Sequence, residues 1–369
     1  MIGFDLSDEQ KMIRETVAAF AIEEIRPAAR PADESGTIPL ALIAKGWELG
    51  LVRGAIPEEF GGYGDARSAV TGAITVEELA YGDLAIAMHM LAPQLLAYPL
   101  IEAGSPSQRA QFLPQFAVDA FVPASAALME PRFDFEPSLM ETTARRDGGG
   151  FILNGDKCYV PLAAQSASML IYAATDREKG YAGVDAFIVP RNTAGLAVSA
   201  REKNMGLKAL ETFEMKLTDC RVGSEARLGG ESGINFTRQL SQSRVAMAAM
   251  AVGVARAAYD YARAYAKERK AFGVPIATKQ AIAFMLAEMA IELDATRLLV
   301  WDAASRLDKG DNALKESSQA RNYAAQSCLA IADNALQVLG GHGYIREHPV
   351  ELWLRNARCF GVLEGLATA

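Results

Sequence analysis

Apolar residues recur at the spacing of a helix near the start of the chain. The residues that share this spacing are Ile13, Val17, Phe20 and Ile25. One buried helical face produces such a pattern, and Ser7 with Gln10 has the form of a capping box. Because proline lacks the N–H that a helix interior needs, Pro27 should end the helix. The pattern therefore predicts a helix over residues 5–25.

Helical periodicity returns between residues 66 and 118, after the turn-rich stretch IPEEFGGYG. Pro93, Pro99 and the GSPS stretch interrupt it, so we expect several short helices rather than one long one. The first third of the chain is thus predicted to be an all-α unit.

The pattern changes after Pro123, where short runs alternate between apolar and polar residues. SMLIYAAT, VDAFIVP and TFEMKLTDCRV are bounded by polar residues, glycine or proline, as strands are. Asn154-Gly155, in the stretch FILNGDKCYVP, is a strong hairpin signal. Residues 123–228 are therefore predicted to form a β domain.

From Ser232 onward the periodicity is helical again. The first helix should run from Gly233 and be closed by Gly273, because glycine commonly follows the last turn of a helix. Further helices are predicted over residues 277–309, 313–339 and 348–362, with GGHGY as the break before the last of them. Long antiparallel helices of this kind pack as a four-helix bundle.

The predicted fold is mainly α with a β insert, in three parts. Residues 1–122 should form an N-terminal α-helical domain, residues 123–230 a middle β domain, and residues 231–369 a C-terminal four-helix bundle.

Charge and hydropathy exclude two classes of partner. The formal net charge is −8, whereas a nucleic-acid groove needs a basic surface, so we expect no nucleic-acid partner. The longest strongly apolar run, Met247–Ala255, is too short to span a bilayer. The first residues lack the basic segment and apolar core of a secretory signal. We therefore expect a cytoplasmic protein without a membrane span.

The 4 cysteines are far apart and form no CxxC pair, so reduced, mostly buried thiols are expected. His342 and His348 do not have the spacing of ligands on one helical face. No metal site is predicted.

Short motifs in a fixed order point to a family. These are IPEEFGGYG, ITVEELAYGD, LMEP, FILNGDKCYV, the NMG before LKALETFEMKLTDCRV, SRVAMAAMAVGVARAAYDYARAYAKERKAFGVPI, QVLGGHGY and RNARCFGVLEG. Each is weak alone, but together they make the sequence resemble the acyl-CoA dehydrogenase family over nearly its whole length. The resemblance implies an N-terminal helical domain, a middle β-barrel domain and a C-terminal four-helix bundle, with FAD as cofactor and an acyl-CoA as substrate.

The resemblance also implies a base. Such enzymes remove the α-proton of an acyl-CoA thioester with a carboxylate while the β-hydrogen leaves as hydride to flavin N5. Glu364 occupies the position of that carboxylate, and we expect it in an apolar pocket that raises its basicity. Gly365 would let the thioester approach, and the N–H of Glu364 would bind the thioester carbonyl. Relatives with the base on the first bundle helix have it where this chain has Ser243, which leaves Glu364 as the candidate.

Other matching residues concern the ligands. Arg244 matches an arginine that holds the CoA portion. A further set matches residues that reach the FAD bound by a neighbouring subunit: Arg269, Phe272, Gln280, Gln337, Gly340 and Gly341. The resemblance thus implies a homotetramer or dimer, and an electron-transfer flavoprotein or similar protein as electron acceptor.

The chain departs from the family around its own flavin. Met129, within Leu128-Met129-Glu130-Pro131, replaces a threonine, and Phe135 stands in place of a serine beside the acyl site. Tyr159-Val160-Pro161 replaces Trp-Ile-Thr, and Pro161 cannot donate to flavin N5. The candidate contacts to the flavin remain Leu128, Met129, Tyr159 and Val160. In the loop of residues 126–131 these contacts would be made by backbone N–H groups.

These departures leave two readings open. The chain is either a FAD-dependent acyl-CoA dehydrogenase in its own right, or a divergent subunit that lends half a FAD site to a second subunit of this type. A flavin-dependent monooxygenase on the same fold is a third reading, against which Glu364 argues.

Overall fold

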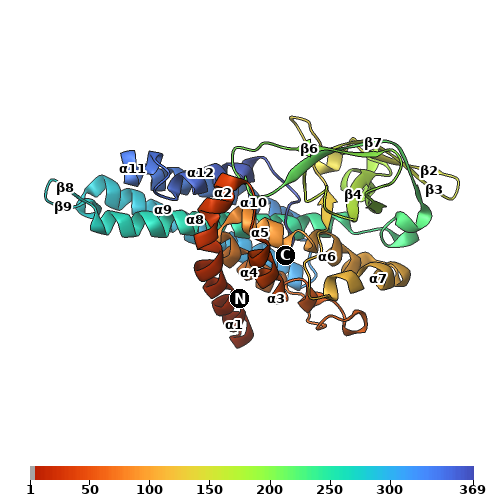
Figure 1. The fold of residues 1–369 in the computed structure, drawn as a ribbon, viewed down its shortest axis with the longest axis horizontal. Coiled ribbons are helices and arrows are strands. Elements are labelled where there is room, and N and C mark those ends of the chain that lie inside the picture. The colour runs from red at the N-terminus through yellow and green to blue at the C-terminus, as the bar shows by residue number, and fades with distance from the viewer. Residues whose placement is uncertain (1–4) are drawn as a thin grey trace.

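The computed structural model describes residues 5–369. Its first part consists of short helices (Figure 1): α1 Asp8–Phe20, α2 Arg26–Ser35, α3 Leu40–Glu48, α4 Ala69–Gly82, α5 Leu84–Leu91, α6 Gln94–Ala103 and α7 Pro106–Phe112. The Ser7–Gln10 capping box is present at the start of α1.

Pro27 does not end the first helix, so that prediction was wrong. A π-helical turn, Ala21–Ile25, joins α1 to α2. Pro27 lies in the first turn of α2. The N–H groups of a first turn have no acceptor within the helix, so proline loses no helical hydrogen bond there. The helical path therefore continues to Ser35 and ends at Gly36, whose φ of 71° is left-handed.

The middle of the chain forms a 7-stranded curled sheet. Its strands are β1 Ser125–Ala127, β2 Thr143–Asp147, β3 Gly150–Pro161, β4 Ser168–Ala174, β5 Val184–Pro190, β6 Leu196–Arg201 and β7 Thr212–Gly223. They pair in the order β1-β4-β2-β3-β7-β6, with β5 also paired to β4. The alternation predicted for β7 matches its burial pattern, in which Phe213, Met215 and Leu217 face the core.

The predicted hairpin at Asn154-Gly155 was wrong. The turn lies earlier, where Asp147 of β2 pairs with Gly150 of β3, and Asn154-Gly155 lies inside β3 at an irregularity of the ladder to β7. A Cβ on Gly155 would come within 2.5 Å of Thr142 Oγ1. The glycine therefore serves a close backbone approach rather than a turn.

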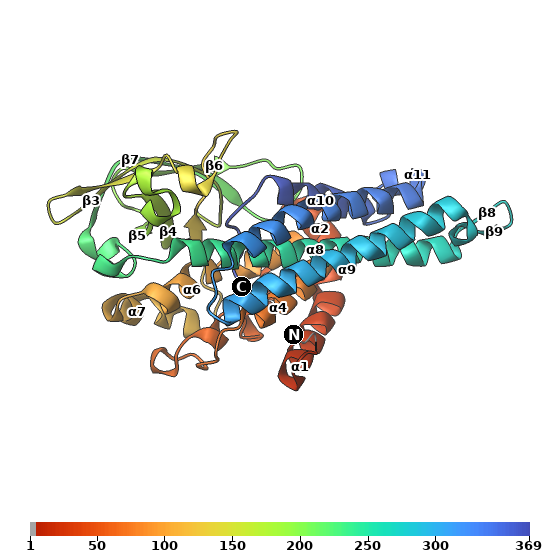
Figure 2. The ribbon, with the colours of Figure 1, turned by 180° about the vertical axis from the view of Figure 1, so that it is seen from behind.

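The last part is a bundle whose long helices lie side by side (Figures 1 and 2): α8 Phe236–Glu268, α9 Gln280–Asp308 and α10 Leu314–Leu339. A shorter helix, α12 Val350–Ala357, packs against α10 and α8. The short helix α11, Gly341–Tyr344, precedes α12. The first bundle helix ends at Glu268, not at Gly273 as predicted. Strands β8 Lys270–Ala271 and β9 Val274–Pro275 follow it, and Phe272 and Gly273, with φ of 56° and 83°, form the turn between them. Two left-handed residues suit a two-residue hairpin turn.

Buried charges hold the N-terminal helices to the bundle. Glu77 and Glu78 of α4 are each 6% exposed, and they pair with Arg256 of α8, while Glu77 also pairs with Arg297 of α9 at 2.9 Å. Gly253 lets α8 approach α4 closely, since a Cβ there would lie 2.2 Å from Glu77 O. The bundle, the β sheet and the N-terminal helices thus meet along α8.

Within residues 5–369 no single helix is long and apolar enough to cross a membrane. Only the pair α5 and α6, bent by 42° at its break, passes that test together, by length and composition alone.

Candidate functional site

The pocket that contains Glu364 has a volume of about 720 Å³. It opens where the loop between β1 and β2, the end of β3, α8, α10 and the segment after the 3-10 turn Arg358–Gly361 come together. Its lining includes Met129, Glu130, Arg132, Phe135, Glu136, Cys158, Tyr159, Tyr181, Arg244, Ser318, Arg321, Val362 and Glu364. The structure therefore brings to one site five residues that were predicted separately: Glu364, Arg244, Phe135, Met129 and Tyr159.

Helix α12 positions the segment that carries Glu364. Arg355 of α12 pairs with Asp33 of α2 at 2.7 Å, and Trp353 is 1% exposed in the core. Beyond the helix, Arg321 of α10 donates to the carbonyl of Leu363 at 3.1 Å. Glu364 is thereby held facing the pocket with only 6% of its surface exposed.

The Glu364 carboxylate is paired with guanidinium groups. Arg244 Nε donates to Glu364 Oε1 at 2.5 Å, and Arg321 Nε lies 3.6 Å from the same oxygen. Burial lowers the pKa of Arg244, but the hydrogen bond and charge of Glu364 outweigh it, so the pKa of Arg244 lies above its ordinary value. The apolar surroundings predicted for Glu364 were wrong, because charged side chains from the β1–β2 loop, α8 and α10 line this pocket.

The backbone around Glu364 is also engaged. Its N–H donates to Met129 Sδ at 3.1 Å, so this thioether occupies the donor predicted to bind the thioester carbonyl. Gly365 has a φ of 80°, and a Cβ there would lie 2.6 Å from the Leu128 side chain. Leu128 therefore faces Gly365 and not the large pocket. A thioester that binds to the Glu364 N–H has to displace the Met129 side chain.

Lys157 and Glu130 form a buried pair that sequence reasoning missed. Glu130 accepts the N–H of Thr142 at 2.6 Å, and Lys157, fully buried on β3, donates to Leu128 O at 2.9 Å. Burial lowers the pKa of Lys157 to about 8 against the opposing charge of Glu130. The pair fixes the backbone of residues 128–130. The available signal was a lysine within a stretch that the sequence predicts as a strand.

Tyr159 and Val160 differ in what they face. Tyr159, with a φ of 52°, lines the pocket, and its N–H donates to Glu202 Oε1 at 3.2 Å. Val160 is 1% exposed, pairs with Phe213 and packs in the core of the β domain. Its predicted contact with the cofactor can therefore involve only its backbone.

Two unsatisfied guanidinium atoms fit a ligand with hydrogen-bond acceptors. Within residues 5–369, Arg132 Nε and Arg321 Nε are buried and form no hydrogen bond, although carboxylate oxygens of Glu130 and Glu364 lie 3.5 and 3.6 Å from them. Both side chains line the pocket. Buried polar atoms without a hydrogen bond are uncommon unless a ligand or water satisfies them. A flavin ring system carries carbonyl and ring-nitrogen acceptors, so these residues suit the FAD that the resemblance implies.

The residues predicted to serve a neighbouring FAD lie elsewhere. Figures 1 and 2 show the β8–β9 hairpin and α11 at the end of the bundle that points away from the β sheet. Residues at this end are exposed: Arg269, Phe272, Gln280, Gln337, Gly340 and Gly341. Phe272 is 96% exposed, and a Cβ on Gly340 or Gly341 would meet no atom within 4 Å. Within one chain the structure does not bring this set to the Glu364 pocket.

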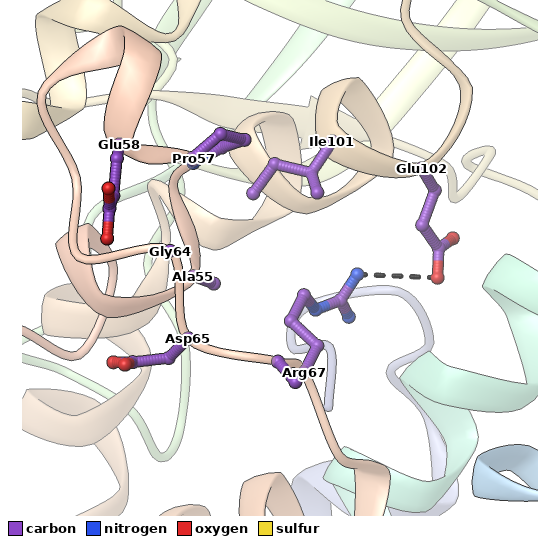
Figure 3. Close-up of a pocket in the computed structure, with 9 residues that line it drawn as sticks. Ala55, Pro57, Glu58, Gly64, Asp65, Arg67, Ile101 and Glu102 are labelled. Carbon is purple, nitrogen blue, oxygen red and sulfur yellow. Dashed lines mark ion pairs between the residues drawn. The ribbon is translucent and has the colours of Figure 1, made fainter.

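A second cavity, of about 550 Å³, lies over the N-terminal helices (Figure 3). Arg67 and Glu102 face each other across it, with 3.3 Å between Arg67 Nη1 and Glu102 Oε1. Glu102 also accepts a hydrogen bond from Gln242 of α8. Arg67 and Glu102 thus satisfy one another at this cavity, and none of the residues predicted to bind ligands lines it.

In sequence comparisons, each of the three parts of the chain matches a domain of known proteins. Residues 7–119 match the acyl-CoA dehydrogenase N-terminal domain, residues 125–220 its middle domain and residues 232–367 its C-terminal domain. The mitochondrial short-chain specific acyl-CoA dehydrogenase of Rattus norvegicus is 34% identical over 365 residues, which are 98% of this chain and 88% of the relative.

Solved structures agree with the fold. Butyryl-CoA dehydrogenase from Megasphaera elsdenii superposes with a TM-score of 0.87 at 28% identity, covering 100% of this chain and 96% of the other. A chain in a structure described as the electron transferring flavoprotein of Acidaminococcus fermentans has the same TM-score, 0.87, at 30% identity, with 100% and 96% coverage. The predicted order of helical, β and helical domains is thereby confirmed.

Proposed function

Because this chain belongs to the acyl-CoA dehydrogenase family, we propose that it converts an acyl-CoA thioester to the trans-2-enoyl-CoA with Glu364 as the α-proton base. FAD is the cofactor of the family, and when bound it accepts the β-hydrogen as hydride at N5. The observation that carries the proposal is a buried carboxylate, Glu364, that faces a cavity of about 720 Å³.

Arg244 orients Glu364 for its proposed role as a base. Arg244 Nε donates to Glu364 Oε1 at 2.5 Å and Arg244 Nη2 to Oε2 at 3.5 Å, so the two contacts fix the plane of the carboxylate oxygens. Glu364 Oε then takes the α-proton of a thioester held beside Gly365, and Arg244 and Phe135 bound the space around the thioester and its CoA portion. Water is excluded because Glu364 and Arg244 are only 6% and 7% exposed.

The proposed assembly is supported by the residues at the far end of the bundle. Exposed Arg269, Phe272 and Gln280 would complete the FAD site of a second copy, in a homodimer or homotetramer. An exposed apolar stripe on α9, formed by Phe284, Ile291 and Leu298, supports such contacts, since these side chains are 59%, 67% and 46% exposed. The proposed electron acceptor is an electron-transfer flavoprotein or a similar protein.

The test of the proposed activity is product formation. The purified FAD-loaded protein is incubated with a dye acceptor and acyl-CoAs of increasing chain length, and the products are weighed by mass spectrometry. We expect a product lighter by two hydrogens for at least one acyl-CoA. Absence of an enoyl product for straight, branched and aromatic acyl groups alike would contradict the proposal.

A second candidate is the half-site subunit of a heteromeric acyl-CoA dehydrogenase. It is favoured by the Met129 thioether on the Glu364 N–H, at 3.1 Å, and by the small space of about 30 Å³ between α6, α8 and Gly365. In this reading the exposed residues of the far end serve a partner's FAD, while the chain's own site stays closed. FAD retention only after co-expression with a second dehydrogenase of this type would support it, and a FAD-loaded homomer would contradict it.

A further inference from the structure

The Glu364 pocket holds a second carboxylate, Glu136, to which the proposed reaction assigns no part. Glu136 lies on the loop between β1 and β2, and Tyr181, in the 3-10 segment Arg177–Gly183, donates to its Oε1 at 2.6 Å. Both side chains line the same cavity as Glu364 and Arg244. Within residues 5–369 Glu136 forms no ion pair, so its charge is not neutralised by a direct cationic partner.

Arg244 lines the same cavity as these two carboxylates. Its Nε donates to Glu364 and its Nη1 to Ser318 Oγ at 2.8 Å. Tyr181 and Glu136 both act on the guanidinium as stabilising neighbours, after the larger effects of burial and of Glu364. The five N–H groups of an arginine are enough to serve Glu364, Ser318 and Tyr181 at once.

Proton transfer to Glu364 creates an electrostatic problem at this position. Once Glu364 Oε carries the α-proton it is neutral, and Arg244, 7% exposed, loses its direct counter-charge. A buried cation without a partner is strongly destabilised. The proton-accepting state is therefore reachable only if another anion balances Arg244.

We propose that Glu136, acting through the Tyr181 hydroxyl, is the positioning pair that balances Arg244 whenever Glu364 is protonated. When the thioester binds, Arg244 shifts its hydrogen bonding toward Tyr181, which frees an oxygen of Glu364 for the α-proton. No bond is made or broken at Glu136 or Tyr181. This inference rests on the proposed function and deepens it.

Other charges at the pocket are already matched. Glu130 is held by Lys157 and lies 3.5 Å from Arg132. The titratable and charged groups that line the cavity around Glu364 are Glu130, Arg132 and Glu136 from the β1–β2 loop, Cys158 and Tyr159 from β3, Tyr181, Arg244 from α8 and Arg321 from α10. Once Glu364 is protonated, Arg244 and Arg321 lose its negative charge. Glu136 is then the carboxylate of this cavity that can balance them, since it forms no ion pair of its own within residues 5–369.

The sign of the expected effect follows from this charge balance. Replacing Glu136 by glutamine removes the negative charge that balances Arg244 while Glu364 holds the α-proton, so that state becomes less favourable. Glu136→Gln should therefore slow α-proton abstraction by about 3- to 10-fold and move the acid limb of its pH profile about 0.5 to 1 unit lower. Tyr181→Phe should act in the same direction by less, because the charge of Glu136 remains.

The experiment isolates proton abstraction from oxidation. FAD-loaded protein is incubated in D2O with acetyl-CoA, which has no β-hydrogen to lose, and deuterium uptake at its α-carbon is followed by mass spectrometry against pH. Glu48→Gln, an exposed carboxylate at the end of α3, is the matched control and should behave as wild type. Glu364→Gln should abolish the exchange.

The outcomes separate this inference from the proposed function. Exchange that depends on Glu364 but has the same pH profile and rate in Glu136→Gln as in wild type would overturn the positioning role alone. Exchange that is absent in wild type, or that persists in Glu364→Gln, would overturn both. If Glu136→Gln does not fold, an unchanged profile in Tyr181→Phe overturns the inference and a shifted one supports it.

Discussion

The carboxylate of Glu364 and the guanidinium of Arg244 form a buried ion pair, with 2.5 Å between Oε1 and Nε. Both side chains lie on the wall of one cavity but come from chain segments 120 residues apart. The pair holds the proposed base in place, and it also has to loosen before the base can act. Most of the expected behaviour of the site follows from this relationship.

Arg244→Gln should destabilise the protein and weaken catalysis together. Removing one partner of a buried pair leaves Glu364 with only Arg321, 3.6 Å from its Oε1, and costs about 3–5 kcal/mol of unfolding free energy. The carboxylate also loses the hydrogen bond that orients its oxygens, so α-proton abstraction should slow. Denaturant unfolding and the rate of deuterium exchange measure the two effects.

The control for Arg244 lies on the same helix. Arg263 is half exposed and pairs with Asp260 one turn away, so Arg263→Gln should change the free energy of unfolding by no more than about 0.5 kcal/mol. Equal stability losses in the two variants would contradict a buried pair at Arg244.

Met129→Thr should improve acyl-CoA binding. The thioether accepts the Glu364 N–H at 3.1 Å, and a shorter side chain would leave this donor for the thioester carbonyl. A hydrogen bond of this kind contributes about 0.5–1.5 kcal/mol, or about 2- to 10-fold in KM. Steady-state kinetics measure the effect, with Met205→Thr at an exposed methionine as the control. A KM that rises in Met129→Thr would show that Met129 aids binding.

His89 should make the protein sensitive to mild acid. Burial lowers the pKa of His89 to about 4, below its value of 6.5 in the unfolded chain. The unfolded state therefore binds more protons between these values, and stability is lost as pH falls from 6.5 towards 4, at up to about 1.4 kcal/mol per pH unit.

The variant His89→Phe isolates this effect, because it keeps the stacking on Phe121, whose ring lies 5.5 Å away. Its unfolding free energy should fall less steeply over the same pH range, measured by urea unfolding at several pH values. Identical slopes in wild type and variant would contradict the assignment.

Arg269→Gln should lower the FAD content without lowering fold stability. Arg269 is exposed and directly precedes β8, which Figure 2 shows at the end of the bundle away from the β sheet, so its loss removes no core contact. If it serves the FAD of a second copy, the absorbance ratio of flavin to protein should fall after dilution, and Lys270→Gln next to it should have less effect. Equal FAD retention in both variants would contradict a role between subunits.

Sequence patterns were sufficient for the architecture and insufficient for contacts. Periodicity located α1, α9, α10 and β7, because each buries one regular face. It failed at Pro27, Gly155 and Gly273, because a proline or glycine indicates an unusual backbone conformation without saying which. Pro27 lies in a first helical turn, Gly155 allows a close approach to Thr142, and Gly273 lies in a hairpin turn.

The same limit applies to the site. Motif order identified Glu364, Arg244 and Met129 as separate candidates, but spacing along the chain carries no information on which side chains pair. The Arg244–Glu364 ion pair, the Met129 thioether on the Glu364 N–H and the second cation beside Glu364, Arg321, depend on three-dimensional packing. Arg321 gave one signal, its place among the small residues Ser317, Ala320 and Ala324 on a buried face of α10.

The most direct test of the central claim is single-turnover reduction of the bound flavin by an acyl-CoA that the wild type oxidises. The visible flavin absorbance is followed after anaerobic mixing, in wild type, Glu364→Gln and the surface control Glu48→Gln. General-base catalysis contributes about 10²- to 10⁴-fold, so the rate in Glu364→Gln should fall by at least that range while Glu48→Gln bleaches like wild type. Bleaching of Glu364→Gln at the wild-type rate would contradict the assignment of Glu364 as the base.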